Sequence, residues 1–453
     1  MDLTRLRDRT RGALLEPGDE GYAEACTLWN ARVEKRPAAV LRCRGAADVL
    51  TGVEVARDSS LPFSVRSGGH HVSGSALADG GLTLDLRPMD WVRVDPDRER
   101  AWVGPGATWG DVDHETGAFG LAVPGGQDPN IGVAGLTLGG GVGWLSRRYG
   151  LTCDNLRSAD VVTADGDLVR ASASENEDLF WALRGGGGSF GVVTTFEFDL
   201  HPVGEVFAGS LVHPHDRAGA LARRYESFLA DAPREVRLLF GSMVLPAASY
   251  FPESVHDTRV AICIVCYAGD PEAGREVLEP LREFGDPLFD SLRARPYAAF
   301  QRAGESRGSM RTHLRSQYLD SLSAGAVETV TGWAERAPSA GATVFVSPRS
   351  GAETDPPADA TAYPHREDAH HLLVEARWDD PTDDEAHVDW VESFHEAVEP
   401  YTTGEVAANF VGSEEGERRE RAAYGENYER LVEVKRRWDP EGLFRATPAL
   451  APD

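Results

Sequence analysis

Residues 62 to 74 read Pro62-Phe63-Ser64-Val65-Arg66-Ser67-Gly68-Gly69-His70-His71-Val72-Ser73-Gly74. A short apolar run ends here in a glycine-containing turn, which is the pattern of a strand followed by a tight loop. Glycine lets a main chain approach a ligand closely and adopt positive φ, so that its N–H groups can face an anion. A histidine at the end of such a turn can contact the rest of the ligand that carries this anionic group.

A second glycine-rich segment reads Gly132-Val133-Ala134-Gly135-Leu136-Thr137-Leu138-Gly139-Gly140-Gly141-Val142-Gly143-Trp144. A third lies at residues 184–191, ahead of a strand-like run. Such segments indicate tight turns, and two of them together fit one large ligand held by backbone from both sides. If that ligand is a flavin dinucleotide, His70 reaches the flavin ring. The alternative is a turn histidine that bonds a backbone carbonyl. None of the segments matches a Rossmann fingerprint.

The composition limits the partners that the chain can have. Its 453 residues fit two domains, and 46 Lys and Arg against 73 Asp and Glu give a net charge of −27. We therefore expect no nucleic-acid partner, because no wide face neutralises phosphates. Lys35 and Lys435 are the only lysines. We favour a halophilic source, where a carboxylate-rich surface stays hydrated, over a GC-rich genome that prefers arginine codons.

Neither a membrane span nor a secretory signal is visible in the sequence, so we expect a cytoplasmic protein with no membrane partner. The five cysteines are an odd number, which argues against a disulfide framework. Cys263 and Cys266 lie in an apolar strand-like run, and alternation places them on opposite faces. With no second pair available, we predict buried thiols and no metal site.

Periodicity predicts an α+β protein. Residues 36–204 alternate short strands and helices, as a cofactor domain would, and residues 1–35 are expected to form a helical extension that packs on it. Residues 205–404 predict an antiparallel sheet covered by helices, a separate substrate domain. Residues 405–450 return to the first domain, with one long charged helix over 414–438 that Pro440 ends.

Four motifs occur in the order typical of one known family. They are Arg66-Ser67-Gly68-Gly69-His70; the glycine-rich segment from Gly132; Tyr149-Gly150-Leu151-Thr152-Cys153-Asp154-Asn155; and Asn427-Tyr428-Glu429-Arg430-Leu431 with Trp438-Asp439-Pro440 and Leu443-Phe444. From about Ala38 to Phe444 the chain resembles the berberine-bridge-enzyme-like flavoproteins of the vanillyl-alcohol-oxidase and p-cresol-methylhydroxylase superfamily. The resemblance implies a two-subdomain PCMH-type FAD-binding domain, followed by a substrate domain.

The resemblance also implies how FAD is held. The histidine directly after Gly-Gly, which is His70 and not His71, would form an 8α bond to the flavin. Many relatives add a bond from a cysteine, but Asp128 stands at that position, so a single covalent bond is expected, as in the bacterial hydroxynicotine-oxidase branch. A noncovalent FAD enzyme is the alternative. The expected FAD contacts are His70, Arg66, Ser67, Gly68, Gly69, His71, Gly126, Asp128, Gly132, Gly135, Thr137, Gly139, Gly143, Asn155, Val193 and Asn427.

Oxidation by a flavin needs a hydride taken to N5 and a proton taken from an O–H or N–H group. Some relatives place a Glu or Gln five residues before a tryptophan, where this chain has Leu373. The remaining candidates are His371, on the same predicted strand, and Tyr424 and Tyr428, one helical turn apart. A tyrosine base would need a cation such as Arg366 or Arg377 nearby. Tyr424 is otherwise a packing residue of the helix face.

We therefore expect an FAD-linked oxidase that takes a hydride from an alcohol, sugar hemiacetal or amine carbon and reduces O₂ to H₂O₂. Ile131 lies at the family position next to the oxygen-reacting carbon of the flavin. Its bulk leaves open a dehydrogenase that uses another acceptor. A flavin-binding protein that has lost catalysis is the alternative from a different class.

Overall fold

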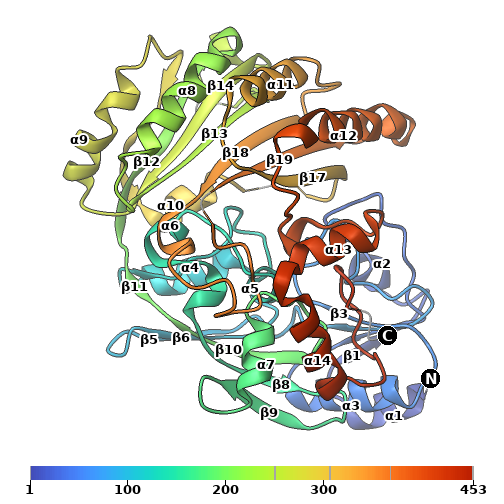
Figure 1. Ribbon diagram of the computed structural model, residues 1–453. Coiled ribbons are helices and arrows are strands. Elements are labelled where there is room, and N and C mark those ends of the chain that lie inside the picture. The colour runs from blue at the N-terminus through green and yellow to red at the C-terminus, as the bar shows by residue number, and fades with distance from the viewer. Residues whose placement is uncertain (1, 249–250, 306–307, 368, 451–453) are drawn as a thin grey trace.

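The structure is a computed structural model that describes residues 2–248, 251–305, 308–367 and 369–450. Two smaller sheets form its lower part, and one larger sheet beneath four helices forms its upper part (Figure 1). Helices and antiparallel sheets occur side by side, so the predicted α+β class is confirmed. The predicted cofactor residues come mainly from the lower part, and the predicted base His371 comes from the upper sheet.

The first sheet contains the strand that carries the motif of residues 62–74. Its order is β1-β2-β4-β3, with β2, β4 and β3 parallel and β1 antiparallel to β2. The strands are β1 (Ala13–Leu15), β2 (Ala39–Arg42), β3 (Phe63–Arg66) and β4 (Leu82–Asp85). Helices α1 (Leu3–Arg9) and α3 (Ala46–Arg57) share a hydrophobic core with this sheet. The loop after β3 therefore starts from a buried, rigid strand.

The prediction that residues 1–35 are helical is wrong in part. Only α1 and the short α2 (Tyr22–Ala25) are helical, and β1 lies between them. Leu14 pairs with Leu41 of β2, so the segment extends the sheet at its edge. Sheet pairing here overrides local helical preference, because it satisfies backbone groups that a helix end would leave unpaired.

The second sheet is antiparallel, with the order β5-β6-β10-β8-β9. The strands are β5 (Val92–Asp95), β6 (Arg100–Val103), β8 (Leu156–Val162), β9 (Leu168–Ser172) and β10 (Val192–Asp199). The β8–β9 hairpin turns through Asp165-Gly166 as predicted, with Gly166 at a φ of +83°. The helices α4 (Trp109–Gly117), α5 (Val133–Leu138) and α7 (Glu177–Leu183) share its core. Short elements β7 (Leu121–Ala122), β11 (His201–Pro202) and α6 (Ser146–Tyr149) complete this part.

The upper sheet is antiparallel and has the order β15-β12-β14-β13-β18-β19-β17, with β16 also paired to β12. Its strands are β12 (Glu205–Pro214), β13 (Val236–Val244), β14 (Arg259–Tyr267), β15 (Phe289–Asp290), β16 (Arg293–Pro296), β17 (Arg311–Leu319), β18 (Ala342–Arg349) and β19 (Ala369–Trp378). Four helices cover its outer face: α8 (Ala218–Leu229), α9 (Pro271–Arg282), α11 (Ala324–Glu335) and α12 (Asp384–Val398) (Figure 1). The short α10 (Tyr297–Arg302) lies below it. The helix-covered sheet expected after residue 205 is confirmed.

The C-terminal segment carries two helices where one was predicted. Helix α13 (Gly416–Tyr424) ends at Gly425, whose φ of +46° an α-helix does not contain, and α14 (Tyr428–Trp438) starts in a new direction. Helix α14 lies against α7 of the lower part (Figure 1). The segment therefore runs along both the upper sheet and the second sheet.

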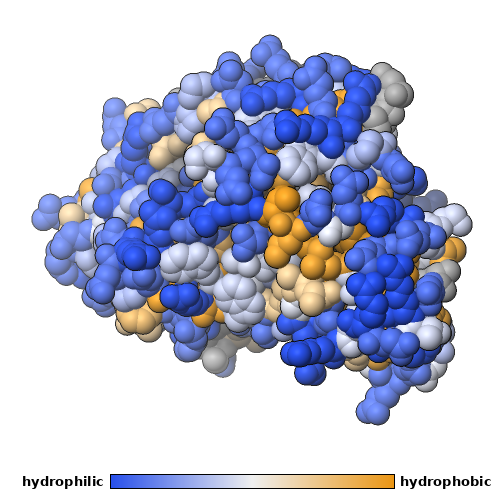
Figure 2. Space-filling model, turned by 90° about the horizontal axis from the view of Figure 1, so that it is seen from below, coloured by the Kyte–Doolittle hydropathy of each residue, from blue (hydrophilic) through white to orange (hydrophobic). Residues whose placement is uncertain are grey.

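The surface fits the acidic composition. Figure 2 shows the lower face as mostly hydrophilic, with one local hydrophobic area near its middle. Among the helices of the residues that the structure describes, none has the length and apolar character that crossing a bilayer requires.

Candidate functional site

The first two glycine-rich segments touch each other, main chain against main chain. A Cβ on Gly68 would lie 2.7 Å from the nitrogen of Gly132, and a Cβ on Gly132 would lie 2.6 Å from the nitrogen of Gly68. Both distances are far below a normal contact, so only glycine allows this approach. The two segments therefore lie in direct backbone contact, and whether they hold one large ligand from both sides stays a prediction.

The loop after β3 presents a run of unused donors. Among the described residues, none accepts a hydrogen bond from the main-chain N–H groups of residues 67–72. Consecutive unpaired N–H groups of a turn form a concavity that binds anions. Gly135, in the second segment, has no atom within 4 Å of the place where a Cβ would be, unlike its neighbours Gly132 and Gly139. The residues present thus fit an anionic dinucleotide such as FAD.

His70 lies at the end of this loop in a confined position. Its ring stacks on Trp29 with centroids 4.6 Å apart, and its Nε2 lies 3.9 Å from Oδ2 of Asp128. Burial lowers the pKa of His70 to about 4, with Arg377 acting in the same direction and Asp128 against both. The imidazole is therefore neutral near pH 7 and has a lone pair available for bonding.

Strand β19 of the upper sheet faces this loop with alternate residues. Leu372, Val374, Ala376 and Trp378 belong to the core under the helices, so His371, Leu373, Glu375 and Arg377 point the other way. We call these four residues the inner face of β19. Arg377 lies 4.8 Å over the Trp29 ring, and His371 lies 5.1 Å from the Phe410 ring. The inner face thus extends from the His70 end of the site to the C-terminal segment.

His371, predicted as a base, lies on this inner face. Its Nε2 is 2.6 Å from the hydroxyl of Ser316, on the neighbouring strand β17. Burial, helped by Arg237 and Arg349, lowers the pKa of His371 to about 3. The ring is therefore neutral near pH 7, and one of its nitrogens carries a lone pair.

Glu375 is an inner-face carboxylate that the sequence analysis missed. It is 9% exposed and accepts a hydrogen bond of 3.0 Å from Nε of Arg377. Counting back from Trp378 pointed to Leu373, which lies on the same face two residues away. Strand alternation from His371 is the signal that identifies Glu375.

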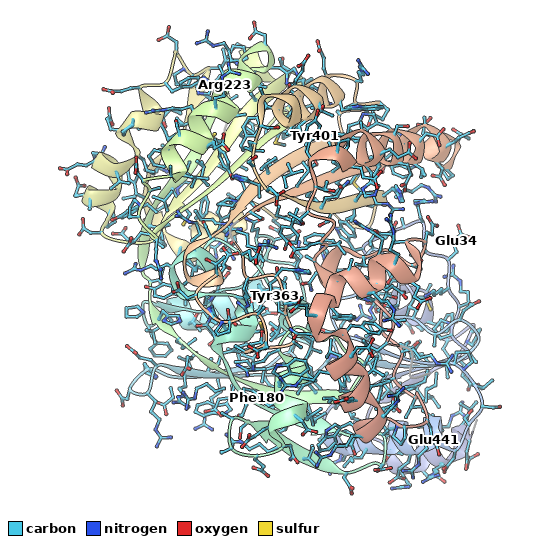
Figure 3. All side chains as sticks on the ribbon, viewed as in Figure 1. Glu34, Phe180, Arg223, Tyr363, Tyr401 and Glu441 are labelled. Atoms are coloured by element: carbon cyan, nitrogen blue, oxygen red, sulfur yellow. The ribbon has the colours of Figure 1, made fainter. Side chains whose placement is uncertain are left out.

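Two tyrosines that no motif pointed to join the upper sheet to the glycine segments. The hydroxyls of Tyr318 and Tyr363 are 2.8 Å apart, and both rings are buried. A Cβ on Gly140 would lie 2.6 Å from the nearest atom of Tyr363, and a Cβ on Gly185 would lie 2.4 Å from it. Only glycine therefore fits beside Tyr363 at these two positions. Figure 3 labels Tyr363 between the upper and lower parts. This pair fixes the distance between β17 and the cofactor loops.

The predicted tyrosine bases, Tyr424 and Tyr428, are not brought to β19. Tyr424 is fully buried in the core of the lower part, and its hydroxyl donates to the carbonyls of Gly186 and Pro448. Burial raises its pKa. Tyr428 packs in the same core under Arg421, whose guanidinium lies 4.2 Å from the ring. The cation expected beside them, Arg366, pairs instead with Asp154.

Several predicted FAD contacts use their side chains to shape the loops. Arg66 donates to the carbonyls of Ala25 and Thr27, Ser67 to Pro105, Thr137 to Val133, Asn155 to Tyr149 and Leu151, and Asn427 to Ala358 and Thr361. Val193 is buried in β10, the Gly126 carbonyl accepts from Gln301, and the Gly143 N–H donates to Ser146. These residues hold the cradle in shape and leave its main chain to face a ligand.

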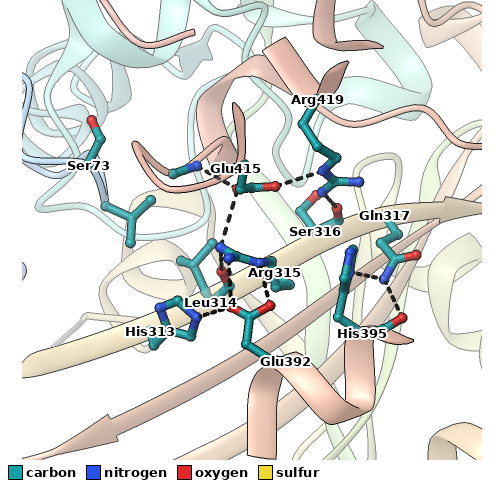
Figure 4. A network of polar contacts seen from close by, with 12 residues as sticks. Ser73, His313, Leu314, Arg315, Ser316, Gln317, Glu392, His395, Glu415 and Arg419 are labelled. Carbon is teal, nitrogen blue, oxygen red and sulfur yellow. Dashed lines mark hydrogen bonds and ion pairs between the residues drawn. The ribbon is translucent and has the colours of Figure 1, made fainter. Parts of the chain in front are cut away.

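The loop at residues 408–412 brings the C-terminal segment to the site. The Ala408 carbonyl lies 3.4 Å from Nε2 of His71, and the Asn409 amide donates to the Gly135 carbonyl at 3.1 Å. Glu415 holds this loop through the Gly412 N–H and Arg419, and Arg315 of β17 links it to Glu392 of α12 (Figure 4). The segment is thereby fastened to the upper sheet and the glycine segments at once.

Several known proteins that are similar to this chain are named for FAD. A family model described as FAD binding domain matches residues 37–172, and another described as berberine and berberine like matches residues 408–450. The uncharacterized FAD-linked oxidoreductase YgaK of Bacillus subtilis (strain 168) is 30% identical over 463 residues, covering 100% of this chain and 98% of that protein. The (R)-6-hydroxynicotine oxidase of Paenarthrobacter nicotinovorans is 34% identical over 310 residues, covering 68% of this chain and 66% of that protein.

Solved structures agree with these relatives. The crystal structure of 6-hydroxy-D-nicotine oxidase from Arthrobacter nicotinovorans has a TM-score of 0.87 at 29% identity and covers 98% of both chains. The berberine bridge enzyme from Eschscholzia californica has a TM-score of 0.87 at 19% identity, with 100% of this chain and 99% of that chain covered, which shows the common fold. With a full-length relative at 30% identity and the site geometry above, the chain belongs to the berberine-bridge-enzyme-like family of FAD-linked oxidoreductases.

Proposed function

We propose that this oxidoreductase is an oxidase with covalently bound FAD, which removes a hydride from an alcohol, sugar hemiacetal or amine carbon and passes the electrons to O₂. The observation that carries the proposal is the neutral imidazole of His70 at the end of the unpaired N–H cradle, facing the inner face of β19. FAD, when bound, supplies a two-electron acceptor at N5. The protein supplies orientation and a proton acceptor.

His70 would carry the covalent bond to the flavin 8α-methyl group. The bond would join an imidazole nitrogen to the methyl carbon, with loss of one N–H and one C–H hydrogen as two protons and two electrons. O₂ would take up both and give H₂O₂. Asp128 has no thiol to offer a second bond, which supports a single link.

His371 would take the proton from the substrate O–H or N–H group. We assign the ring proton to Nε2, where it is donated to the Ser316 hydroxyl, and the lone pair to Nδ1. A pKa of about 3 keeps that lone pair free at neutral pH. Glu375 is the second acceptor within the inner face, although Arg377 occupies one of its oxygens.

The test starts with the purified holoprotein. We expect yellow colour that stays with the acid-precipitated pellet, one FAD mass on the chain, and loss of both in His70→Ala. Substrates are then screened by H₂O₂ release under air, beginning with 6-hydroxynicotine and cyclic amines, because a relative is named for that activity. Flavin that dissociates in acid contradicts the covalent link. Flavin that no alcohol, sugar or amine bleaches under nitrogen contradicts the oxidoreductase assignment to these substrates.

A dehydrogenase is the second candidate, and Ile131 favours it. The side chain of Ile131 packs 3.3 Å from the Cβ position of Gly126, at the family position next to the oxygen-reacting carbon. Mixing photoreduced protein with air-saturated buffer separates the two. Reoxidation within seconds supports the oxidase, whereas slow reoxidation that Ile131→Gly accelerates supports the dehydrogenase.

A further inference from the structure

The ring of His70 has one neighbour against its face, Trp29, and another near its edge, Asp128. Trp29 stacks on it with an interplanar angle of 25°, and the Trp29 N–H donates to the Gly69 carbonyl at 3.2 Å. Arg377 lies over the same indole. The stack sets the plane of the imidazole, and the backbone bond ties Trp29 to the residue that precedes His70.

Asp128 faces the edge of the ring that carries Nε2. Its Oδ1 accepts the Asn130 N–H at 2.9 Å, which fixes the carboxylate, and its Oδ2 lies 3.9 Å from Nε2 of His70. This is about 1 Å longer than an N–H···O hydrogen bond, a gap that a small ring movement closes. Among the described residues, no other carboxylate oxygen lies within 4 Å of a His70 ring nitrogen. Nδ1 is the second ring nitrogen, joined to Nε2 through Cε1.

A neutral imidazole has one nitrogen with a proton and one with a lone pair. When the lone pair forms a bond to carbon, the ring becomes cationic until the other nitrogen gives up its proton. At His70 this cation is disfavoured by burial and by Arg377. A fixed carboxylate at the N–H edge removes that obstacle, because it accepts the proton as the bond forms.

We propose that Asp128 is a positioning residue for the attachment of FAD: it keeps the proton of His70 on Nε2, leaves Nδ1 as the bonding nitrogen, and accepts the Nε2 proton as the bond forms. This inference rests on the proposed covalent link at His70. The Nδ1–carbon bond would form while the methyl C–H bond and the Nε2–H bond break. The Nε2 proton would pass to Asp128 and the C–H proton to solvent, and the two electrons would pass to O₂, which takes up two protons to give H₂O₂, or to another two-electron acceptor. Many relatives have a cysteine where this chain has Asp128. Here the carboxylate would promote the single covalent bond, which is the one at His70.

Asp128→Asn is the matched variant, because it keeps an oxygen for the Asn130 N–H and removes the proton acceptor. We compare the time course of covalent FAD incorporation into wild type, Asp128→Asn and Asp128→Glu, all prepared flavin-depleted and mixed with FAD under air. Total bound flavin before acid is recorded beside acid-stable flavin after it. We expect Asp128→Asn to bind FAD but to form the covalent bond at least about 10²-fold more slowly, which is the lower end of the usual range for loss of a general base.

Two readouts separate this role from a purely structural one. Acetate or formate should restore the rate of incorporation in Asp128→Gly, because a small carboxylate can enter the space that the side chain leaves. NMR of the flavin peptide from the wild type should place the flavin on Nδ1. If Asp128→Asn does not fold, Asp128→Ser, which retains a turn-forming oxygen, takes its place.

The outcomes are distinguishable. A wild type without acid-stable flavin, or with a link that survives His70→Ala, overturns the proposed covalent site itself. A wild type linked at His70, with Asp128→Asn linked at the same rate, overturns only the role of Asp128. A flavin found on Nε2 does the same, since Asp128 would then face the bonding nitrogen.

Discussion

Trp29 stacks on His70, and the guanidinium of Arg377 lies over the same indole, so that the N-terminal segment contacts both the glycine loop and β19. The neighbouring Asn30 strengthens this connection. Its amide donates to the Val72 carbonyl at 2.9 Å, and its oxygen accepts from the Thr312 N–H at 3.2 Å. Trp29 and Asn30, which lie outside both glycine segments, therefore help to set the position of His70 relative to the upper sheet.

Replacing Trp29 tests this connection. We expect Trp29→Ala to lower the acid-stable flavin fraction while FAD still binds, because the His70 ring loses its stacking partner. An aromatic stack is worth about 0.5–1.5 kcal/mol, and the cation–π contact adds about 0.5–1 kcal/mol. Trp29→Phe retains a ring and should keep most of the linkage. Equal acid-stable flavin in both variants and the wild type would show that the stack does not position His70.

Gly68→Ala tests the contact of the two glycine segments. The added methyl would lie 2.7 Å from the Gly132 nitrogen, and both segments are backbone that cannot simply rotate away. Overpacking of this kind costs about 1–3 kcal/mol, so we expect lower thermal stability together with loss of FAD. Gly332→Ala is the control, since its methyl meets nothing within 4 Å on a helix and should be neutral or stabilising. A Gly68→Ala protein that binds FAD and melts like the wild type would contradict the close approach.

His371→Asn addresses the proposed proton acceptor. We expect kcat to fall by about 10²–10⁴-fold while acid-stable flavin is unchanged, because the imidazole acts on substrate and not on FAD attachment. Ser316→Ala should cause a smaller loss, since the ring loses only its orienting bond. If Glu375 is the acceptor instead, Glu375→Gln causes the large loss and His371→Asn the small one.

The pH profile gives a second check on His371. Because its folded pKa of about 3 lies below the ordinary value near 6.5, the folded state binds fewer protons than the unfolded state between these values. The contribution of this group to stability is therefore fully present above about pH 6.5 and is lost as the pH falls toward 3. We expect kcat to show no His371 ionisation between about pH 5 and 8. A kcat step near pH 6.5 that disappears in His371→Asn would contradict the low pKa.

One buried and one exposed arginine–carboxylate pair allow the contribution of burial to the free energy of unfolding to be compared. Arg237 and Glu353 are 1% and 2% exposed at their side chains, whereas Arg234 and Asp355 are 55% and 52% exposed. Arg237→Met leaves the Glu353 carboxylate buried without its cation and should cost about 3–5 kcal/mol of unfolding free energy. Arg234→Met should cost about 0–1 kcal/mol. Urea unfolding measures both, and equal losses would refute the difference.

The sequence predicted the site best where chemistry and backbone geometry leave few choices. The strand, glycines and histidine of residues 62–74 specify the β3 loop almost alone, because positive φ and close approach require glycine. Strand β17 does not follow from apolar periodicity, because residues on its helix-facing side, such as Arg315, are polar and pair with charged groups of α12. Its strand character depends on partners distant in sequence, which periodicity does not reveal.

The position of the two predicted tyrosines also depends on tertiary packing. Tyr424 and Tyr428 remain neighbours, with ring centroids 6.4 Å apart, but the chain turns at Gly425 and both rings pack in the core of the lower part. Glu375 was missed because the count from Trp378 assumed the register of relatives, whereas the face of a strand is fixed by alternation within this chain. Local rules thus located the flavin end of the site, and the substrate end required the three-dimensional arrangement.

Lys435 of α14 is buried, and its ammonium bonds the carbonyls of Ser189 and Phe444 as well as Asp439. Helix α14 also fills the core beside α7, although residues 205–404 are synthesised between these two helices. On the ribosome, the FAD-binding part therefore waits with an incomplete core while the upper sheet emerges. The core that supports the glycine segments is therefore complete only after the C-terminal helices have been translated.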